Sequence, residues 1–81
     1  MTLHIIFTNE IVILSKKGYR NWREIQDEFE SYKASLGPWT EKETIEWLCT
    51  EYPNLKPSAH EQVSKFVSDQ SEMTKLTFNG D

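Results

Sequence analysis

The single cysteine, Cys49, and His60 are the one nucleophile–base pair that the sequence offers for covalent catalysis. A catalytic cysteine needs a lowered pKa and some exposure to solvent. Cys49 falls between Ile45 and Tyr52 on the apolar stripe of an expected helix, which predicts a buried and unreactive thiol. We therefore do not expect this pair to act in catalysis.

Metal and cofactor chemistry lack the residue patterns that they need. The spacing of His4, Cys49 and His60 matches no zinc site, and the strand expected at the N-terminus directs His4 outward. The three glycines are not clustered, so no loop is suited to hold a phosphate. Carboxylates are numerous, but acid–base catalysis needs two of them in a cleft. We expect no enzyme activity, no metal and no cofactor.

Trp47 is the residue that most strongly indicates a binding function. It belongs to an expected helix over residues 41–52, whose buried stripe, by its i, i+3, i+4, i+7 spacing, consists of Ile45, Leu48, Cys49 and Tyr52. Trp47 lies roughly opposite that stripe among carboxylates, as expected of a tryptophan that anchors a protein–protein contact. The predicted partner-binding residues are Trp47, Trp39, Glu43, Glu46 and Glu51. The alternative is that Trp47 packs under the basic segment or the C-terminal tail as a second core layer.

The charge distribution favours a basic protein partner over a nucleic acid. The net charge is −4, and between Glu24 and Glu51 eight acidic residues stand against only two lysines, Lys33 and Lys42. An acidic surface repels phosphate backbones and suits basic protein surfaces. The simpler alternative is a charged surface that only keeps the protein in solution.

A basic segment over residues 16–23 precedes the acidic part of the chain. It contains Lys16, Lys17, Arg20 and Arg23, with Tyr19 and Trp22 among them. Bases interleaved with aromatics occur at single-stranded nucleic-acid sites. Four charges are too few to distinguish such a site from an ordinary loop, and Trp22 fits a core stripe. We expect a solvated connection.

Helices over 41–52 and 58–70 suggest a helix-turn-helix, which makes a DNA-binding regulator the alternative function. The second helix begins with residue types that can contact base edges: Ser58, His60, Glu61 and Gln62. The linker contains two prolines and is longer than usual. Only Lys56 and Lys65 are close enough to neutralise phosphates, so the electrostatic contribution to binding would be small.

Residues 3–15 predict a β-hairpin with its turn at Asn9-Glu10. Pairing Phe7 with Val12 creates one wholly apolar face, made of Leu3, Ile5, Phe7, Val12 and Leu14. The other face includes Ile6, Ile11 and Ile13, which we expect to be covered by the C-terminal tail or buried in a partner, with a homodimer as one form of this. The alternative is a helix from Glu10 to Lys17 that ends at Gly18.

Three helices are predicted from pairs of capping residues. The first begins at Asn21 with Glu24, carries a stripe of Trp22, Ile25, Phe29, Tyr32 and Leu36, and ends at Gly37-Pro38. The second begins with Thr40 and Glu43, and the third with Ser58 and Glu61. The stripe of the third consists of Ala59, Val63, Phe66 and Val67. Residues 74–78 have β character and suggest a third strand, while residues 79–81 should fray.

These features predict an α+β fold in one domain over residues 1–81: an N-terminal hairpin, with a third strand from the C-terminus, packed by three helices. One cysteine and the lack of a signal-peptide pattern favour a cytoplasmic (intracellular) protein, which we read as a complete small gene product. No segment is long enough to span a membrane. The expected function is a non-catalytic inhibitor or adaptor that blocks a partner protein, as phage or plasmid inhibitors and antitoxin-like proteins do.

Overall fold

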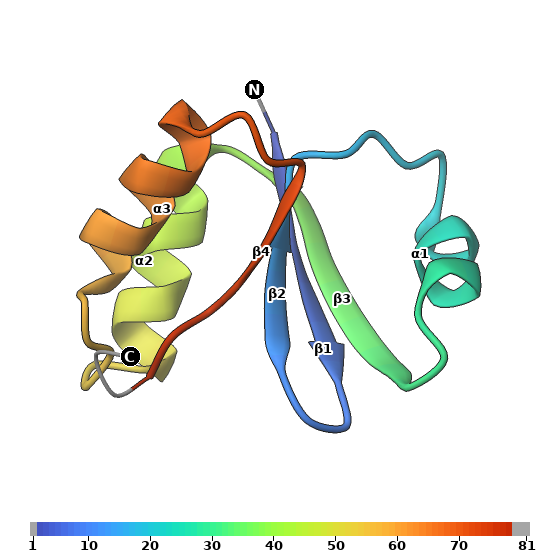
Figure 1. The fold of residues 1–81 in the computed structure, drawn as a ribbon, viewed down its shortest axis with the longest axis horizontal. Coiled ribbons are helices and arrows are strands. Elements are labelled where there is room, and N and C mark those ends of the chain that lie inside the picture. Colours follow the sequence, from blue (N-terminus) through green and yellow to red (C-terminus); the bar gives the residue numbers. More distant parts are fainter. Residues whose placement is uncertain (1, 79–81) are drawn as a thin grey trace.

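The computed structural model describes residues 2–78, which form one four-stranded antiparallel sheet and three helices. The elements along the chain are β1 (Leu3–Thr8), β2 (Val12–Ser15), α1 (Trp22–Glu28), β3 (Tyr32–Trp39), α2 (Glu41–Glu51), α3 (Ala59–Ser68) and β4 (Met73–Lys75). The strand order is β3-β1-β2-β4. Helices α2 and α3 lie side by side on one face of the sheet, and α1 lies on the other face (Figure 1). The predicted α+β class is confirmed.

The N-terminal hairpin has the predicted register. Ile5 is opposite Leu14 and Phe7 is opposite Val12. The Thr8 side chain closes the turn, because its Oγ1 accepts a hydrogen bond from the Ile11 amide and donates one to the Ile11 carbonyl, both at 3.1 Å. This local bonding explains how the chain makes a tight turn without an Asn-Gly pair. The alternative helix over residues 10–17 is wrong.

Each face of the hairpin is buried by a different part of the chain. Leu3, Ile5 and Leu14 pack with α2 and α3, and none of the three has any exposed surface. On the opposite face, Ile6 and Ile13 pack against Ile25 of α1. The expectation that the C-terminal tail or a partner covers this face is therefore wrong for Ile6 and Ile13, which pack under α1, while the homodimer stays a prediction. The segment between β2 and β3 crosses over this face, and only Ile11 of the three predicted isoleucines stays half-buried.

Residues 29–36 are not helical, contrary to the prediction. Helix α1 ends at Glu28, and β3 pairs with β1 through Leu36 opposite Ile5 and Ala34 opposite Phe7. An irregularity in the register between these pairs and Tyr32 places Tyr32 on the α1 face and Leu36 on the α2 face. Tyr32 and Leu36 are four positions apart, which is the spacing of a helical stripe, but in the structure they lie on opposite faces of a strand.

Gly37 permits a close approach of β3 to β1. Its φ angle is +115°, and a Cβ at this position would lie 2.5 Å from the Leu3 carbonyl oxygen. A second irregularity in the β1–β3 register falls here, between the residues that pair with Leu3 and Ile5. Gly37 therefore lies in a strand, at a position where the backbone conformation and the lack of space require glycine. The prediction that Gly37-Pro38 ends a helix is wrong.

Both long helices start at the predicted caps. The Thr40 Oγ1 accepts a hydrogen bond from the Glu43 amide at 3.1 Å, and a Glu43 carboxylate oxygen accepts one from the Thr40 amide at 2.9 Å. Ser58 caps α3 by accepting a hydrogen bond from the Glu61 amide at 3.2 Å. The predicted stripe of α3 is also confirmed, with Ala59, Val63 and Phe66 buried and Val67 half-buried.

The buried face of α2 differs from the predicted stripe. Its two fully buried residues are Thr44 and Leu48, whereas Cys49 is exposed and Ile45 only half-buried. Thr44 tolerates burial because its hydroxyl donates a hydrogen bond to the Thr40 carbonyl at 2.8 Å. The helix is therefore rotated relative to the prediction, which carries Trp47 toward the core and Cys49 toward solvent.

The predicted C-terminal strand is present as β4 beside β2. It begins at Met73, earlier than expected, and the chain continues to the buried Leu76, whose amide donates a hydrogen bond to the Val12 carbonyl at 2.8 Å. The expected fraying of residues 79–81 lies outside the described residues.

Replacing Gly37 by alanine should lower the free energy of unfolding by about 2 kcal/mol or more, because both the positive φ and the contact with the Leu3 carbonyl disfavour a Cβ. The matched control is Gly18→Ala, where a Cβ meets nothing within 4 Å. Chemical denaturation of the two variants provides the comparison. Equal stability of both variants would contradict the assigned conformation of Gly37.

Candidate protein-binding site

Trp47 and four other aromatic residues from separate parts of the fold form one cluster. We call Phe7, Trp39, Trp47, Tyr52 and Phe78 the aromatic cluster. The ring centre of Trp47 lies 5.7 Å from that of Phe7, 6.1 Å from that of Trp39 and 5.9 Å from that of Tyr52. Tyr52 in turn meets Phe78 at 5.2 Å. These tilted and edge-on contacts are the favourable geometry for aromatic pairs, so they hold Trp47 in one position.

Trp47 is half-buried. It is thus neither a fully exposed interface residue nor a fully buried core residue, the two alternatives predicted from the sequence. Trp47 does not lie on the side of α2 that faces away from the core, because it packs against the hydrophobic core to which Leu48 belongs. It does not lie under the basic segment either. Its indole sits at the margin of the core, where one part packs and another part meets solvent.

A shallow hollow of about 390 Å³ opens beside Trp47, and we call it the Trp hollow. Its lining residues are Trp39, Glu43, Glu46, Trp47 and Thr50. Four of the five predicted partner-binding residues therefore come together here, through the end of β3 and one side of α2. The fifth, Glu51, lines a separate hollow with Tyr52 and Phe78.

The Trp hollow combines aromatic surface with negative charge. Glu43 is occupied by the helix cap, while Glu46 forms an exposed ion pair with Lys42 at 4.0 Å, an arrangement that contributes little energy. No basic side chain is among the residues that line the hollow. A lysine or arginine from another molecule could therefore stack on an indole and pair with Glu46 at the same time.

The predicted set of binding residues leaves out Phe7 and Thr50, although the helical spacing already placed Thr50 near Trp47. The predicted hairpin register already placed Phe7 on the face covered by helices, but nothing local connected it to Trp47 forty residues later. Thr50 follows Glu46 by one helical turn, and its hydroxyl donates a hydrogen bond to the Glu46 carbonyl at 3.0 Å. Its position on the helix was the available signal.

The basic segment over residues 16–23 is tied to the rest of the fold. Lys16 donates hydrogen bonds to the carbonyls of Phe66 and Asp69, at 2.8 and 2.6 Å, where α3 ends. Lys17 pairs with Glu28 at 3.0 Å, and this contact raises the pKa of Lys17. Lys16 and Lys17 thus stabilise the fold, whereas the prediction was a solvated connection, which holds for the exposed Arg20 and Arg23.

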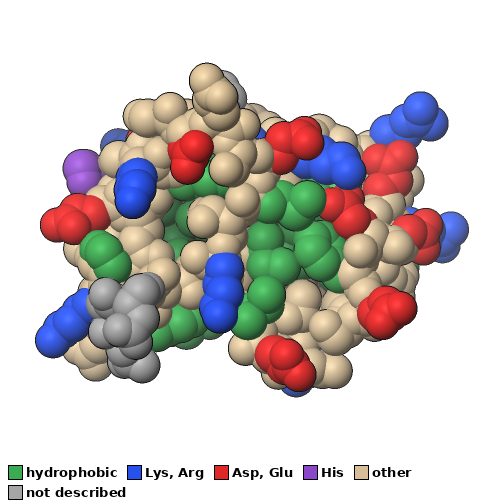
Figure 2. Space-filling view, in the orientation of Figure 1, with side chains coloured by type: hydrophobic (Ala, Val, Ile, Leu, Met, Phe, Trp, Pro, Cys, Tyr) green, Lys and Arg blue, Asp and Glu red, His purple; other side chains and the backbone are tan. Residues whose placement is uncertain are grey.

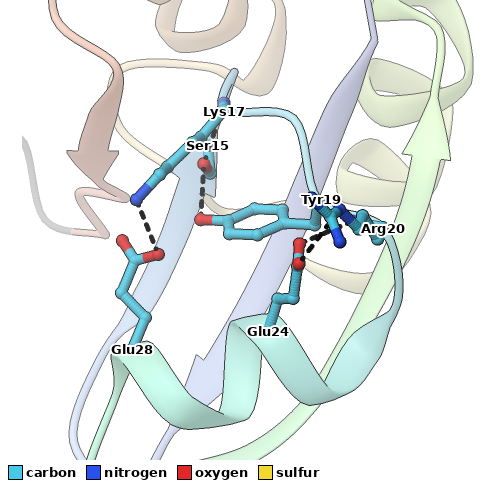
Figure 3. A network of polar contacts seen from close by, with 6 residues as sticks. All are labelled: Ser15, Lys17, Tyr19, Arg20, Glu24 and Glu28. Carbon is cyan, nitrogen blue, oxygen red and sulfur yellow. Dashed lines mark hydrogen bonds and ion pairs between the residues drawn. The ribbon is translucent and has the colours of Figure 1, made fainter.

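The polar contacts of this segment connect α1 to β2 (Figure 3). Tyr19 and Ser15 share a hydrogen bond of 3.1 Å between their hydroxyl groups. Glu24 forms an ion pair with the Arg20 side chain at 3.7 Å and accepts a hydrogen bond from the Arg20 backbone amide at 2.7 Å. The prediction placed this backbone contact at Asn21, one residue later.

Hydrophobic side chains also reach the surface on the α1 side of the sheet. Figure 2 shows them in the middle of this view, with acidic side chains toward the α1 side. The half-buried apolar residues packed on this side are Ile11, Tyr19, Phe29, Tyr32 and Met73. Helix α1 spans only seven residues, so it leaves part of this face uncovered. Trp22, predicted as core, is 53% exposed.

His4 is buried, which corrects the prediction that it points outward. It is 6% exposed, and its ring meets the Tyr19 ring edge-on at 5.0 Å. Its Nδ1 has no hydrogen-bond partner among residues 2–78. Burial lowers the pKa of His4, because the charged imidazolium is poorly solvated there.

Cys49 and His60 lie apart from each other's surroundings, although the predicted burial of the Cys49 thiol is wrong, because Cys49 is exposed. His60 lines a hollow with Glu41, Lys42, Ile45 and Glu46, and Cys49 is not part of that lining. Within residues 2–78 no three potential metal ligands are grouped. None of the described helices combines the length and apolar character needed to cross a membrane.

The Gln62 side chain of α3 forms hydrogen bonds with the C-terminal segment of the chain. The Gln62 side chain donates a hydrogen bond from Nε2 to the Thr77 carbonyl at 2.7 Å. Its Oε1 accepts one from the Thr77 backbone amide at 2.8 Å. A third contact, at 2.6 Å, runs to the Pro57 carbonyl. Gln62 thus holds the C-terminal segment, so its side chain is engaged within the fold, and the DNA-binding alternative stays a prediction.

Comparison with protein-family models, curated proteins and solved structures finds no match for this chain.

The burial of His4 predicts a loss of stability below neutral pH. Because its pKa is lower in the folded state than in the unfolded chain, where it is about 6.5, the folded state binds fewer protons. The free energy of unfolding should therefore be level above that value and fall as the pH decreases from 7 to 5. His4→Phe should remove this decline.

His60→Gln is the matched control, because His60 is exposed. Urea unfolding at a series of pH values measures the effect. A decline that persists in His4→Phe and disappears in His60→Gln would show that the wrong histidine was assigned.

Proposed function

We propose that this chain is a non-catalytic protein-binding module, an inhibitor or adaptor, whose Trp hollow receives a basic side chain of a partner protein. The observation that carries the proposal is the meeting of Trp39 and Trp47 at the surface, beside Glu43 and Glu46 and with no base in the lining. Tryptophan is enriched at the energetic centres of protein interfaces.

The packing of Trp47 favours binding because it reduces the entropy that association must overcome. Phe7 and Tyr52 both contact the indole edge-on, and these contacts restrict its rotamers in the free protein. Fixing a large side chain on binding costs about 0.5–1.5 kcal/mol when it is mobile beforehand, and less when it is already held. The hollow is therefore suited to a partner of complementary shape.

The charge of the chain supports a basic partner in an intracellular location. A net charge of −4 attracts a basic surface at long range and increases the association rate. The thiol of Cys49, exposed and unpaired, is the state expected in a reducing compartment. Both points agree with a small blocking protein that acts inside a cell.

Reversing one charge beside the hollow tests the proposal. Glu46→Lys should weaken capture of the partner by roughly tenfold or more at low salt, since it replaces attraction by repulsion. Binding by the unmodified chain should itself weaken as the salt concentration rises. The measurement is quantitative affinity capture from the source cells, followed by titration of the captured protein.

Glu61→Lys is the control for net charge, because it makes the same change at an exposed position of α3 outside the Trp hollow. Equal loss in both variants would indicate a general charge effect. Full binding by Glu46→Lys would rule out the hollow as the contact.

A further inference from the structure

The outer edge of β3 is free to pair with another strand. Among residues 2–78, β3 has one strand neighbour, β1, and lies at the end of the sheet. A strand at the edge of a sheet presents unpaired amides and carbonyls, which is the basis of recognition by strand addition.

The hydrogen bonds of the sheet identify which groups of β3 point outward. The Val12 carbonyl and the Lys16 amide bond toward the β4 side. Bonding directions alternate along a strand, so Ile13, the neighbour of Val12, bonds toward β1. Its partner Ile6 therefore bonds toward β2, and the neighbours of Ile6 on β1 bond toward β3.

It follows that Ile5 and Phe7 bond to their partners on β3, which are Leu36 and Ala34. The residue between those two, Ser35, then directs its amide and carbonyl away from the sheet. A contact further along agrees, because the Asn9 amide donates a hydrogen bond to the Ser31 carbonyl at 3.1 Å. Pro38 has no amide hydrogen, so the edge available for pairing ends before it.

The free edge and the Trp hollow lie on the same part of the molecule. Ala34 and Trp39 share the α2 face of β3, because their partners Phe7 and Leu3 both belong to the core on that side. Ala34 is small and exposed, which leaves room above the strand. Side chains of an added strand would alternate, and those on this face would point toward Trp39 and Trp47.

We propose that a partner protein adds an extended segment to the edge of β3 at Ser35 and places a lysine or arginine of that segment in the Trp hollow. The inference rests on the proposed function and specifies how the partner is held. The carboxylates of Glu43 and Glu46 select the basic residue, while backbone hydrogen bonds to Ser35 fix the direction and register of the segment.

The test uses two substitutions of one residue. Ser35→Ala removes the hydroxyl, which bonds to the Tyr32 hydroxyl at 3.0 Å, and keeps the outward amide. Ser35→Pro removes the amide as well, at an edge position where the sheet itself loses no hydrogen bond. The probe is a peptide selected on the intact protein from a display library of random twelve-residue sequences.

The selected peptide should contain alternating apolar and polar residues with at least one lysine or arginine. It should bind Ser35→Ala as it binds the unmodified chain, and bind Ser35→Pro about tenfold or more weakly. In the unmodified chain the Ser35 amide should exchange with solvent faster than those of Ala34 and Leu36, and become protected when the peptide is added. If Ser35→Pro does not fold, the exchange measurement on the unmodified chain is the test: strand addition is contradicted when the peptide leaves the Ser35 amide unprotected.

The outcomes separate this inference from the proposed function. If Ser35→Pro binds as well as Ser35→Ala while Glu46→Lys does not bind, the peptide enters the hollow without adding a strand, and only the inference is overturned. If Glu46→Lys also binds normally, the proposed function fails. A selection that yields no peptide of alternating pattern overturns strand addition, and the charge-reversal experiment still judges the proposed function independently.

Discussion

The whole structure depends on the need to cover both faces of one central hairpin. Leu3, Ile5 and Leu14 point to the face covered by α2 and α3, Ile6 points to the α1 face, and none of the four has exposed surface. Burying such a side chain contributes roughly 1.5–3 kcal/mol. A hairpin with the α1 face left in water would lose the contributions of Ile6 and Ile13, so this short chain places helices on both sides.

The candidate site follows from how little chain is available for that cover. Helices α2 and α3 span eleven and ten residues, and α1 spans seven. Elements of this length cover the middle of the sheet and leave its margins partly open. Trp39 ends β3 at one such margin, and Trp47 reaches it from α2. The same aromatic packing therefore finishes the core and creates the surface suited to a partner.

Features encoded by neighbouring residues were predictable from the sequence. The caps at Thr40 and Ser58 depend on residues three positions apart, and the hairpin depends on alternation over a dozen positions. Strand β3 was not predictable in this way, because it exists through pairing with β1 and through an irregular register that the local pattern of Tyr32 and Leu36 disguises as a helix. Tertiary pairing overrode the local signal.

The structure brings four of the predicted binding residues together, although the reason given for their grouping is wrong, and their role in binding stays a prediction. Trp39, Glu43, Glu46 and Trp47 do line one hollow, yet the argument placed Trp47 opposite the buried stripe, whereas it lies at its border. The error arose from Thr44, a polar residue that is buried because its hydroxyl bonds within its own helix. Hydrophobic periodicity counts such a residue as exposed and so rotates the helix by part of a turn.

Fluorescence quenching of Trp47 in the free monomer tests the central claim most directly, namely that this indole is held by the core and still open to a partner. A variant that keeps only Trp47, with Trp22→Phe and Trp39→Phe, is compared with one that keeps only the exposed Trp22. Because Trp47 is half-buried, acrylamide should quench it clearly but less than Trp22. A blue-shifted Trp47 emission that acrylamide does not quench would contradict the central claim.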